Sequence, residues 1–554
     1  MNPRRFRLAL PVLCLLIATG CGSRRAAPPI FTDGTAVTVV DDTAGIPRPE
    51  EQDFLRLSHH VDNFLLRQAR LGLDPAPAPP ALDVNRFGRV PDSSWYANRT
   101  AALDAGQVGQ GPGGDDPGPE AFRPWEVTGL KVGGRNPGFN FRDSRGVGYI
   151  CKFDKAGAPV IATAAGAVAC RLLWAAGYHV PDDRVVHFDP SELLIAEDAK
   201  VKNELGHKRP LTRDDIEEML AVLPQASHGD SVRALVSRFL DGRPIGGFAY
   251  DGTRDDDPND TIPHERRRSL RGLRVFGAWL QHVDQKIDNT LDLYVGESGA
   301  GHVRHYLVDF DGCLGGYWAA RHEKRIGYVH DIDLGEVFSG VPTLGLLKRP
   351  YEDLGAPDHP HVGLFTADRY DPADWAPNYV NDYLHACNPA DAFWAGTVLA
   401  CIDDDMIDAA VDAARFPDPA AAEVLARALR ERRDLTVDWA LRRVSPVVAL
   451  DDIHDHGTVI QISAHDALGL QDRTSDLSWR ADVLDVEGEM LHTLRMLPLD
   501  LITQVPKPAV ADRDYLVVRW TATDKDGRDL PPSEGHYRRG EDGWRLVGVL
   551  RDGE

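Results

Sequence analysis

Three polar residues stand among apolar, strand-forming neighbours and have the types needed for phosphate chemistry. Asp284 and Asn289 lie five positions apart in HVDQKIDN, and Asp309 follows in HYLVDFDG. Carboxylate and amide oxygens are ligands that Mg²⁺ accepts, and another carboxylate can orient a hydroxyl that attacks a phosphate. These residues therefore predict a site for a metal ion and a phosphate. The alternative is that the acids cap turns and have only a structural role.

The elements around these residues change in type along the chain. Residues 126–155 combine glycines with strand-forming residues and predict antiparallel strands, one of which carries Lys152 in YICKFD. The segment VIATAAGAVACRLLWAAG predicts an Ala-rich helix that ends at Gly177. From about residue 265 the pattern is mostly helical. A small β-rich lobe followed by a larger helical lobe is the order of a protein-kinase-like fold.

Four features match the kinase pattern in the same order. Asp284 and Asn289 have the separation of the Asp and Asn in the catalytic loop H-R-D-x-x-x-x-N, and Asp309 stands where the Asp of D-F-G would be. Lys152 lies on a predicted strand, as does the kinase lysine that contacts the phosphates. Each feature alone is common in long chains. Their shared order favours the site over isolated structural acids.

A closer resemblance rests on five segments: LDVNRFGRVPDSSWYANR, NPGFNFRDSRGVGYICKFD, CRLLWAAGYHVPDD, HVDQKIDNTLDLYV and LVDFDG. They resemble a family of secreted or lipid-anchored bacterial proteins that is distantly similar to HipA-type and phosphoinositide-type kinases. The resemblance covers residues 80–440. It implies an α+β chain with an atypical protein-kinase-like two-lobed fold, made of a β-rich N-lobe and a helical C-lobe.

The same resemblance implies a role for each site residue. Asp284 would be the catalytic base, and Asn289 and Asp309 would bind Mg²⁺ or Mn²⁺. Lys152 and the segment GGRNPGF would hold the phosphates of ATP or another nucleotide. The glycines of that segment are Gly133, Gly134 and Gly138.

Two departures from the kinase pattern keep a pseudokinase open as an alternative. Kinases hold the strand lysine with a Glu on the next helix, but residues 160–177 contain no acid and Gly166 stands near the expected place. Lys152 would then be poorly positioned or would pair with an acid from elsewhere. Asp311 replaces the Gly of D-F-G, which adds a third carboxylate.

The N-terminus predicts export and a lipid anchor. A basic segment, MNPRRFR, precedes the apolar LALPVLCLLIATG and then Cys21. This order resembles a bacterial lipoprotein signal, in which Cys21 would be lipidated and become the first residue. Gly22 would favour the outer membrane by analogy. The alternative is an ordinary signal peptide that is cleaved nearby.

Composition shifts divide the chain into five parts. The last part has alternating strands with D-G turns and predicts an all-β, sandwich-like domain. The parts are a signal peptide (1–21), a tether and N-terminal extension (22–125), the N-lobe (126–245), the C-lobe (246–445) and the β domain (446–554).

Net charge and two polar segments narrow the classes of function that the chain can have. The formal charge of −23 argues against a nucleic-acid partner. The acidic loop 251–260 lacks EF-hand spacing and predicts a solvated loop rather than a second metal site, and DHPH at 358–361 predicts a surface loop rather than zinc. Two functions remain: an extracytoplasmic transferase of phosphoryl or nucleotidyl groups, or a scaffold that binds an envelope protein or a glycan.

Overall fold

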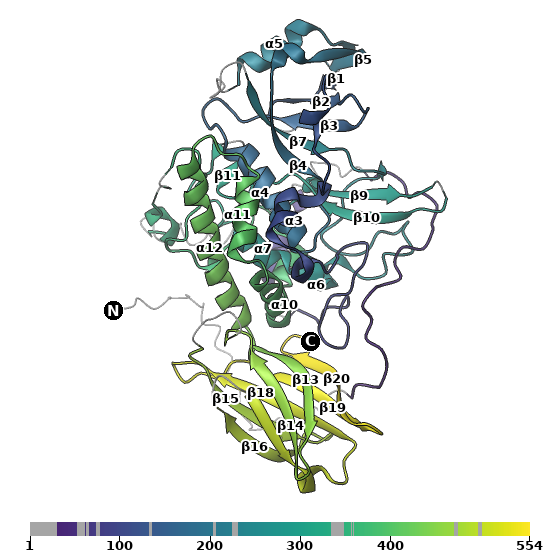
Figure 1. Cartoon of the computed structure of the whole chain (residues 1–554), viewed down its shortest axis with the longest axis vertical. Helices are drawn as coiled ribbons and strands as arrows, with labels where there is room; N and C mark the ends of the chain where they lie inside the picture. Colours follow the sequence, from purple (N-terminus) through teal and green to yellow (C-terminus); the bar gives the residue numbers. More distant parts are fainter. Residues whose placement is uncertain are drawn as a thin grey trace.

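The computed structural model combines helices with several β-sheets, as the sequence predicts (Figure 1). Among the described residues, no helix is both long and apolar enough to cross a membrane. Cys21 and the predicted signal lie outside the described residues. The structure describes residues 30–52, 61–62, 66–73, 78–131, 136–202, 207–223, 231–297, 299–318, 320–333, 348–355, 357, 359–469, 475–496 and 501–554.

A seven-stranded sheet forms the first lobe, in the order β4-β7-β3-β2-β1-β5-β6. All neighbours are antiparallel except β1 and β5. One face packs on α4 (Ile161–Ala175), and α5 (Arg213–Ala221) contributes Ile216 to the hydrophobic cluster of the other face. The strands are β1 (Glu126–Leu130), β2 (Gly138–Arg142), β3 (Gly148–Lys152), β4 (Asp183–Phe188), β5 (Leu194–Lys202), β6 (Lys208–Pro210) and β7 (Val232–Arg238).

The second lobe is less purely helical than the sequence pattern indicates. A three-stranded sheet, β10-β9-β8, lies within it and flanks the Asp284 loop. Its strands are β8 (Arg243–Pro244), β9 (Thr290–Val295) and β10 (His302–Leu307), and a short hairpin follows with β11 (Gly316–Tyr317) and β12 (Ala320–Arg321). The helices are α6 (Arg268–Arg271), α7 (Leu273–Leu280), α9 (Asp382–His385), α10 (Pro389–Ala400), α11 (Asp404–Asp412) and α12 (Pro419–Leu441).

The N-terminal extension packs on this second lobe. Its helices are α2 (Arg67–Leu73) and α3 (Ala105–Gln110), and α3 packs on α11 and α4. The buried Trp95 stacks on the His305 ring of β10 at a centroid distance of 3.4 Å, and the Arg267 guanidinium lies 4.5 Å from the Trp95 ring centroid. Residues 90–108 therefore contribute to the core of the lobe.

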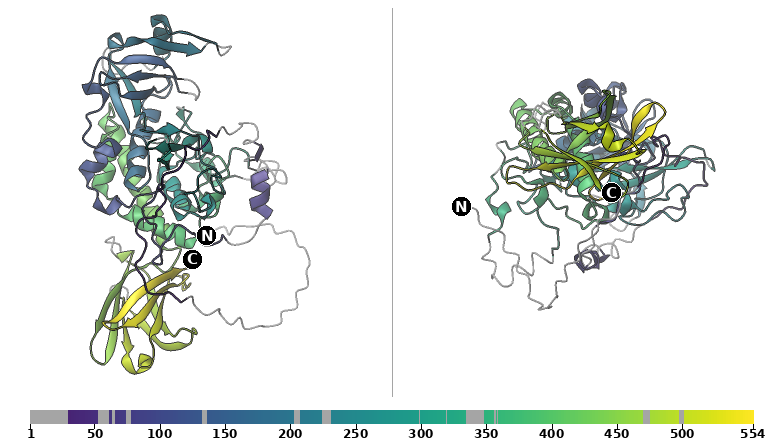
Figure 2. Two further views of the ribbon diagram at one scale, coloured as in Figure 1. Left: turned by 90° about the vertical axis from the view of Figure 1, so that its right-hand side faces the viewer. Right: turned by 90° about the horizontal axis from the view of Figure 1, so that it is seen from below.

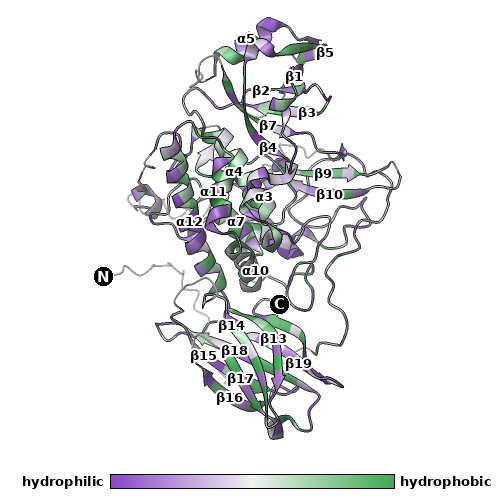
Figure 3. Cartoon of the chain, viewed as in Figure 1, coloured by the Kyte–Doolittle hydropathy of each residue, from purple (hydrophilic) through white to green (hydrophobic). Residues whose placement is uncertain are grey.

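Two antiparallel sheets form the C-terminal part of the molecule, below α10 and α12 in Figure 1 (Figure 2 gives the side view). Both sheets carry hydrophobic and hydrophilic residues (Figure 3), and strand residues of each sheet share one hydrophobic cluster, while β15, β18 and β20 bury a second, smaller one. One sheet has the order β13-β14-β17 and the other β16-β15-β18-β19-β20. The strands are β13 (Val447–Asp455), β14 (Val459–Asp466), β15 (Ser478–Leu484), β16 (Met490–Met496), β17 (Leu501–Pro506), β18 (Tyr515–Thr523), β19 (Ser533–Gly540) and β20 (Gly543–Arg551).

The C-terminal residues return to the helical lobe. The carboxylate of Glu554 accepts a hydrogen bond of 2.8 Å from Nη1 of the buried Arg268. The side-chain amide of Asn388, at the start of α10, donates to the carbonyl of Gly553 at 2.9 Å. The last sheet is thus attached to the helices by polar contacts as well as by its shared core.

Candidate functional site

The end of β3 meets the segment after β10. Lys152 Nζ lies 2.7 Å from Asp309 Oδ1, and the two side chains are 13% and 36% exposed. Burial lowers the pKa of Lys152, but the carboxylates of Asp309, Asp311 and Asp183 outweigh it, so the pKa is raised and the ammonium stays charged. Burial raises the pKa of Asp309, but Lys152 outweighs it and the net shift is downward.

Asp309 adopts an unusual backbone conformation. Its φ is +64°, in the left-handed region that few residues other than Gly occupy. Asp tolerates this region better than most residues, and such strained positions cluster at functional sites. The conformation accompanies the contact between the carboxylate of Asp309 and Lys152.

The Asp284 loop follows α7 and is held by hydrogen bonds within itself. Asp284 Oδ2 accepts hydrogen bonds from Lys286 Nζ at 2.8 Å and from Asn289 Nδ2 at 3.0 Å. The same Asn289 nitrogen donates to the Asp284 backbone carbonyl at 2.8 Å. Because its nitrogen is engaged, Asn289 has its amide oxygen to offer to another ligand. Asp284 Oδ1 is buried and has no hydrogen-bond partner among the described residues.

Backbone contacts hold the two segments side by side. The Val308 N–H donates to the Asn289 carbonyl at 3.0 Å, and the Val283 N–H donates to the Gly312 carbonyl at 3.2 Å. A Cβ at Gly312 would lie only 2.9 Å from the Asp284 Cβ, so the absence of a side chain permits this approach. The structure therefore brings Asp284, Asn289, Asp309 and Lys152 into one region.

Asp311, the departure from D-F-G, joins the same cluster. Its Oδ2 accepts a hydrogen bond of 2.8 Å from Asn136 Nδ2, which belongs to the glycine-rich segment. Burial, and then the charge of Asp309, raise the pKa of Asp311 to about 6. Burial lowers the pKa of Lys131, and the positive charge of Lys152 lowers it further. The negative charges of Asp309 and Asp311 act in the opposite direction, but the net shift is downward. A ligand cation beside Asp311 would relieve this carboxylate repulsion.

The packing of α4 explains why no acid stands near Gly166. A Cβ at Gly166 would lie 2.4 Å from Leu235 Cδ2 of β7, and Leu235 is the cross-strand partner of Lys152. A Glu side chain at this position would therefore have to displace the buried side chain of Leu235. Lys152 pairs with Asp309 instead, and Asp183 lies on the same face of the sheet. Burial raises the pKa of Asp183 to about 7, although Lys152 lowers it.

Four residues near the site were missed at the sequence level: Lys131, Asn136, Asp183 and Lys286. Lys286 and Asn136 had a detectable signal, because they lie inside the segments HVDQKIDN and GGRNPGF. Asp183 and Lys131 lie near Lys152 only through strand register and chain path, which no local pattern shows.

The glycine-rich segment is described only in part. Gly133 and Gly134 lie outside the described residues. Gly138 begins β2 directly opposite Lys152, where a Cβ would lie 2.1 Å from the Cys151 carbonyl oxygen. Any side chain at position 138 would clash with the backbone of β3, so the packing of the two strands by itself explains the glycine.

The donor set suits a magnesium–nucleotide complex. Within the described ranges, no three His, Cys, Asp or Glu side chains are gathered as a ready-made metal cluster. Mg²⁺ is usually held by one or two carboxylates together with substrate phosphates, so Asp309 and the oxygen of Asn289 are chemically suitable ligands. The unpartnered Asp284 Oδ1 remains for a hydroxyl or another donor.

The other polar clusters lie outside this site. Asp260 of the acidic loop accepts hydrogen bonds from Arg267 at 2.7 Å and from the Arg254 N–H at 2.7 Å, so it stabilises its own loop. His359 pairs with Asp418 at 3.0 Å, while Asp358 of the DHPH segment lies outside the described residues.

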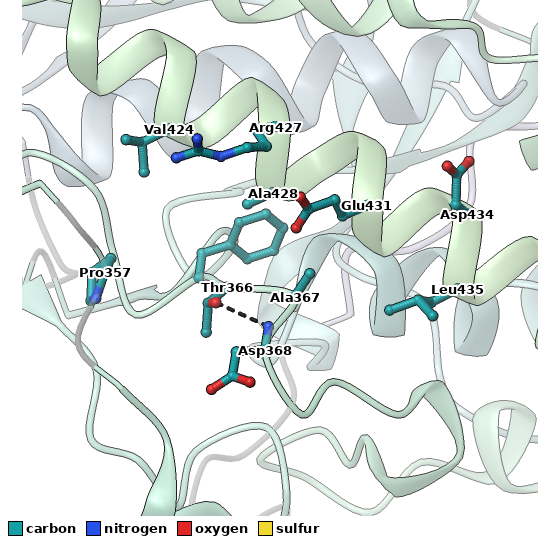
Figure 4. Close-up of a pocket in the computed structure, with 11 residues that line it drawn as sticks. Pro357, Thr366, Ala367, Asp368, Val424, Arg427, Ala428, Glu431, Asp434 and Leu435 are labelled. Atoms are coloured by element: carbon teal, nitrogen blue, oxygen red, sulfur yellow. Dashed lines mark hydrogen bonds between the residues drawn. The ribbon is translucent and has the colours of Figure 1, made fainter.

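A surface pocket of about 630 Å³ beside α12 also shares no residue with the site (Figure 4). Thr366 Oγ1 accepts a hydrogen bond of 3.1 Å from the Asp368 N–H at its edge, and Glu431 and Asp434 project from the helix. It contains none of the Lys, Asp and Asn residues that make up the candidate site.

The chain was compared with protein-family models, curated proteins and solved structures. No protein-family model matches it, and no curated protein matches it. Among solved structures, it is similar to the Helicobacter pylori proinflammatory kinase CtkA, with a TM-score of 0.29 and 13% sequence identity over 56% of this chain and 93% of that chain.

Proposed function

We propose that this chain is a lipid-anchored extracytoplasmic protein with an atypical protein-kinase-like fold. Its site would bind a nucleotide with Mg²⁺ or Mn²⁺ and transfer a phosphoryl or nucleotidyl group to an acceptor. The 2.7 Å contact between Lys152 and Asp309 carries this proposal. It brings an ammonium and a carboxylate from different lobes together, beside the Asp284 loop, which supports a role for Lys152 with phosphates and for Asp309 with a metal ion.

The residues divide the work by their chemistry. Lys152, charged and largely buried, would hold nucleotide phosphates, and Lys131 would add positive charge beside it. Asp309 and the Asn289 oxygen would hold the metal, whose bound charge neutralises the phosphates. Asp284 would accept a hydrogen bond from the acceptor hydroxyl and orient it for attack.

A thermal-shift experiment on the mature chain tests the site. ATP, GTP and other nucleotides should be added with and without Mg²⁺ or Mn²⁺. A ligand present at about one hundred times its Kd adds about 2.7 kcal/mol to the free energy of unfolding. Asp309→Asn should remove the metal-dependent shift, whereas Asp526→Asn on an exposed turn of the β domain should keep it. No shift with any nucleotide and metal would overturn the proposal.

A pseudokinase scaffold is the second candidate, and the packing of α4 favours it. The helix has no acid to position the strand lysine as in kinases, and a Glu at Gly166 would have to displace the buried Leu235. The cleft or the β domain would then hold an envelope protein or a glycan without catalysis. Nucleotide binding without transfer, unchanged in Asp284→Asn, would favour this candidate. Transfer that Asp284→Asn abolishes while binding persists would favour the enzyme.

A further inference from the structure

A second cavity lies where the helical lobe meets the C-terminal sheets. It has a volume of about 550 Å³, within the range of small-molecule sites. Residues of α10, of β13 and β20 and of the segment 87–89 line it, and none of them belongs to the nucleotide site. With Arg268 of α6, five separate stretches of the chain thus converge on one cavity.

The cavity has an aromatic wall. Phe393 and Trp394 of α10 are almost fully buried and face the space, and Trp544 of β20 and Phe87 line it while only partly buried. Aromatic rings bind alkyl chains and other rings by burying apolar area without losing many rotamers. This wall suits the apolar part of a ligand.

The cavity is also basic. Four arginines line it against a single acid, Asp451. Two of the arginines are already neutralised: Arg268 pairs with Asp391 and Glu554, and Arg545 pairs with Asp33. No ion pair of Arg89 or Arg551 is found among the described residues, although the nearby Glu554 carboxylate partly compensates the charge of Arg551. The four arginines are Arg89, Arg268, Arg545 and Arg551.

Two buried guanidinium atoms at this cavity lack partners. Arg551 lies over Phe393 at 4.5 Å from the ring centroid and donates through Nη2 to the Val447 carbonyl at 3.2 Å. Its Nε is buried without a hydrogen-bond partner in the described part of the chain, as is Nη2 of Arg268. Such groups are costly to leave unsatisfied, so they indicate a missing acceptor. Burial lowers the pKa of Arg551 to about 10, which agrees with an incompletely compensated charge.

The backbone at the cavity departs from regular strand geometry. The register of β13 against β14 shifts between Val448 and Asp452, and Ala449 within that shift has a φ of +53°. Bulges and left-handed residues other than Gly occur preferentially at sites where a ligand or side chain must be accommodated. Val448 and Ala449 both line the cavity.

We propose that this cavity binds a small amphiphilic carboxylate, with its apolar part against Phe393, Trp394 and Trp544 and its carboxylate at Arg551 and Arg89. The aromatic wall accounts for the apolar part, and the uncompensated guanidinium groups account for the anion. This site is independent of the proposed nucleotide site, because the two share no residue.

Binding of decanoate to the full mature chain tests the proposal. Isothermal titration and tryptophan fluorescence should show saturable binding of decanoate, and the neutral decanol and the cationic decyltrimethylammonium should bind at least tenfold more weakly. Equal binding of decanol would show that the cavity does not select an anion and would overturn the proposal.

Variants at the cavity rim keep the test independent of core stability. Arg89 is exposed, and Arg89→Ala should weaken decanoate binding about fivefold, the effect of one exposed ion pair. Trp544→Ala should weaken binding at least as much and reduce the fluorescence change. Arg495→Ala, an exposed arginine of β16 outside the cavity, is the matched control and should bind decanoate like the unmodified chain. Unchanged affinity in both rim variants would place decanoate elsewhere and overturn the proposal.

Discussion

The side-chain amide of Asn136 donates a hydrogen bond of 2.8 Å to Oδ2 of Asp311 and so joins the glycine-rich segment to the segment after β10. Lys152 at the end of β3 contacts Asp309 of that same segment at 2.7 Å. Both contacts connect the seven-stranded sheet to loops of the helical lobe. Together they define the region in which a nucleotide would have to bind.

The Asn136 contact should contribute measurably to stability. Asn136→Ala leaves the Asp311 carboxylate with one fewer donor, and we expect the free energy of unfolding to fall by about 1–2 kcal/mol. Asn136→Asp should cost more above pH 6, because it places a second carboxylate beside Asp311. Urea denaturation of both variants at pH 5 and pH 7 measures the difference. Equal stability of both variants at the two pH values would contradict the assigned contact.

Asp311 should make stability depend on pH in a definite direction. Its pKa is raised to about 6 from an ordinary value of 3.8, so the folded chain holds a proton that the unfolded chain has lost between these values. The contribution of Asp311 to the free energy of unfolding is therefore fully present below about pH 4, and it is lost as the pH rises toward 6. In Asp311→Asn this loss disappears, so the variant should gain stability relative to the unmodified chain between pH 4.5 and pH 7.

The control for this measurement is a surface acid. Asp526→Asn, on an exposed turn, should leave the pH profile of urea denaturation unchanged. A profile of Asp311→Asn parallel to that of the unmodified chain would show that Asp311 titrates normally.

An acid installed on α4 should not restore the kinase arrangement. Gly166→Glu would force a side chain into Leu235 and bury a carboxylate, and we expect a loss of about 2–4 kcal/mol. Gly157→Glu is the matched control, because a Cβ at Gly157 meets no atom within 4 Å. Thermal unfolding of the two variants decides the matter. A fully stable Gly166→Glu variant would show that α4 can move away from the sheet.

The lipid anchor can be tested separately from the fold. Cys21→Ser should release the protein from membranes during fractionation of the producing cells, because the thiol is the predicted site of lipid attachment. Cys14→Ser lies within the apolar signal segment and should keep the protein on the membrane. Retention of the Cys21→Ser variant on membranes would exclude the anchor.

Local patterns were sufficient to predict the mixture of helices and strands, and they pointed to the segments that carry the candidate site. Gly-rich alternation marks β1 to β3, and the Ala-rich run marks α4. The strand-forming residues beside Asn289 and Asp309 indicated β9 and β10, but β8 was missed because it has only two residues. Strand runs of that length give little periodicity to detect.

Contacts between side chains far apart in the chain could not be predicted from local sequence patterns. The sequence showed that the next helix has no acid for Lys152, but it could not identify the partner, which is Asp309 in the segment after β10. Asp183 joins the same face only through its register with β7. The junction cavity also depends on segments that no local pattern connects.

The position of Trp95 has a consequence for how the chain folds as it is made. Its stacking partner His305 and its neighbour Arg267 are synthesised much later, and the buried Arg268 meets Glu554, which lies 286 residues further along the chain. Contacts between distant parts of a chain form slowly, because a long loop must close before they are gained. The indole of Trp95 therefore stays exposed during much of synthesis, and a nascent or shortened chain lacking its late residues would be prone to aggregate.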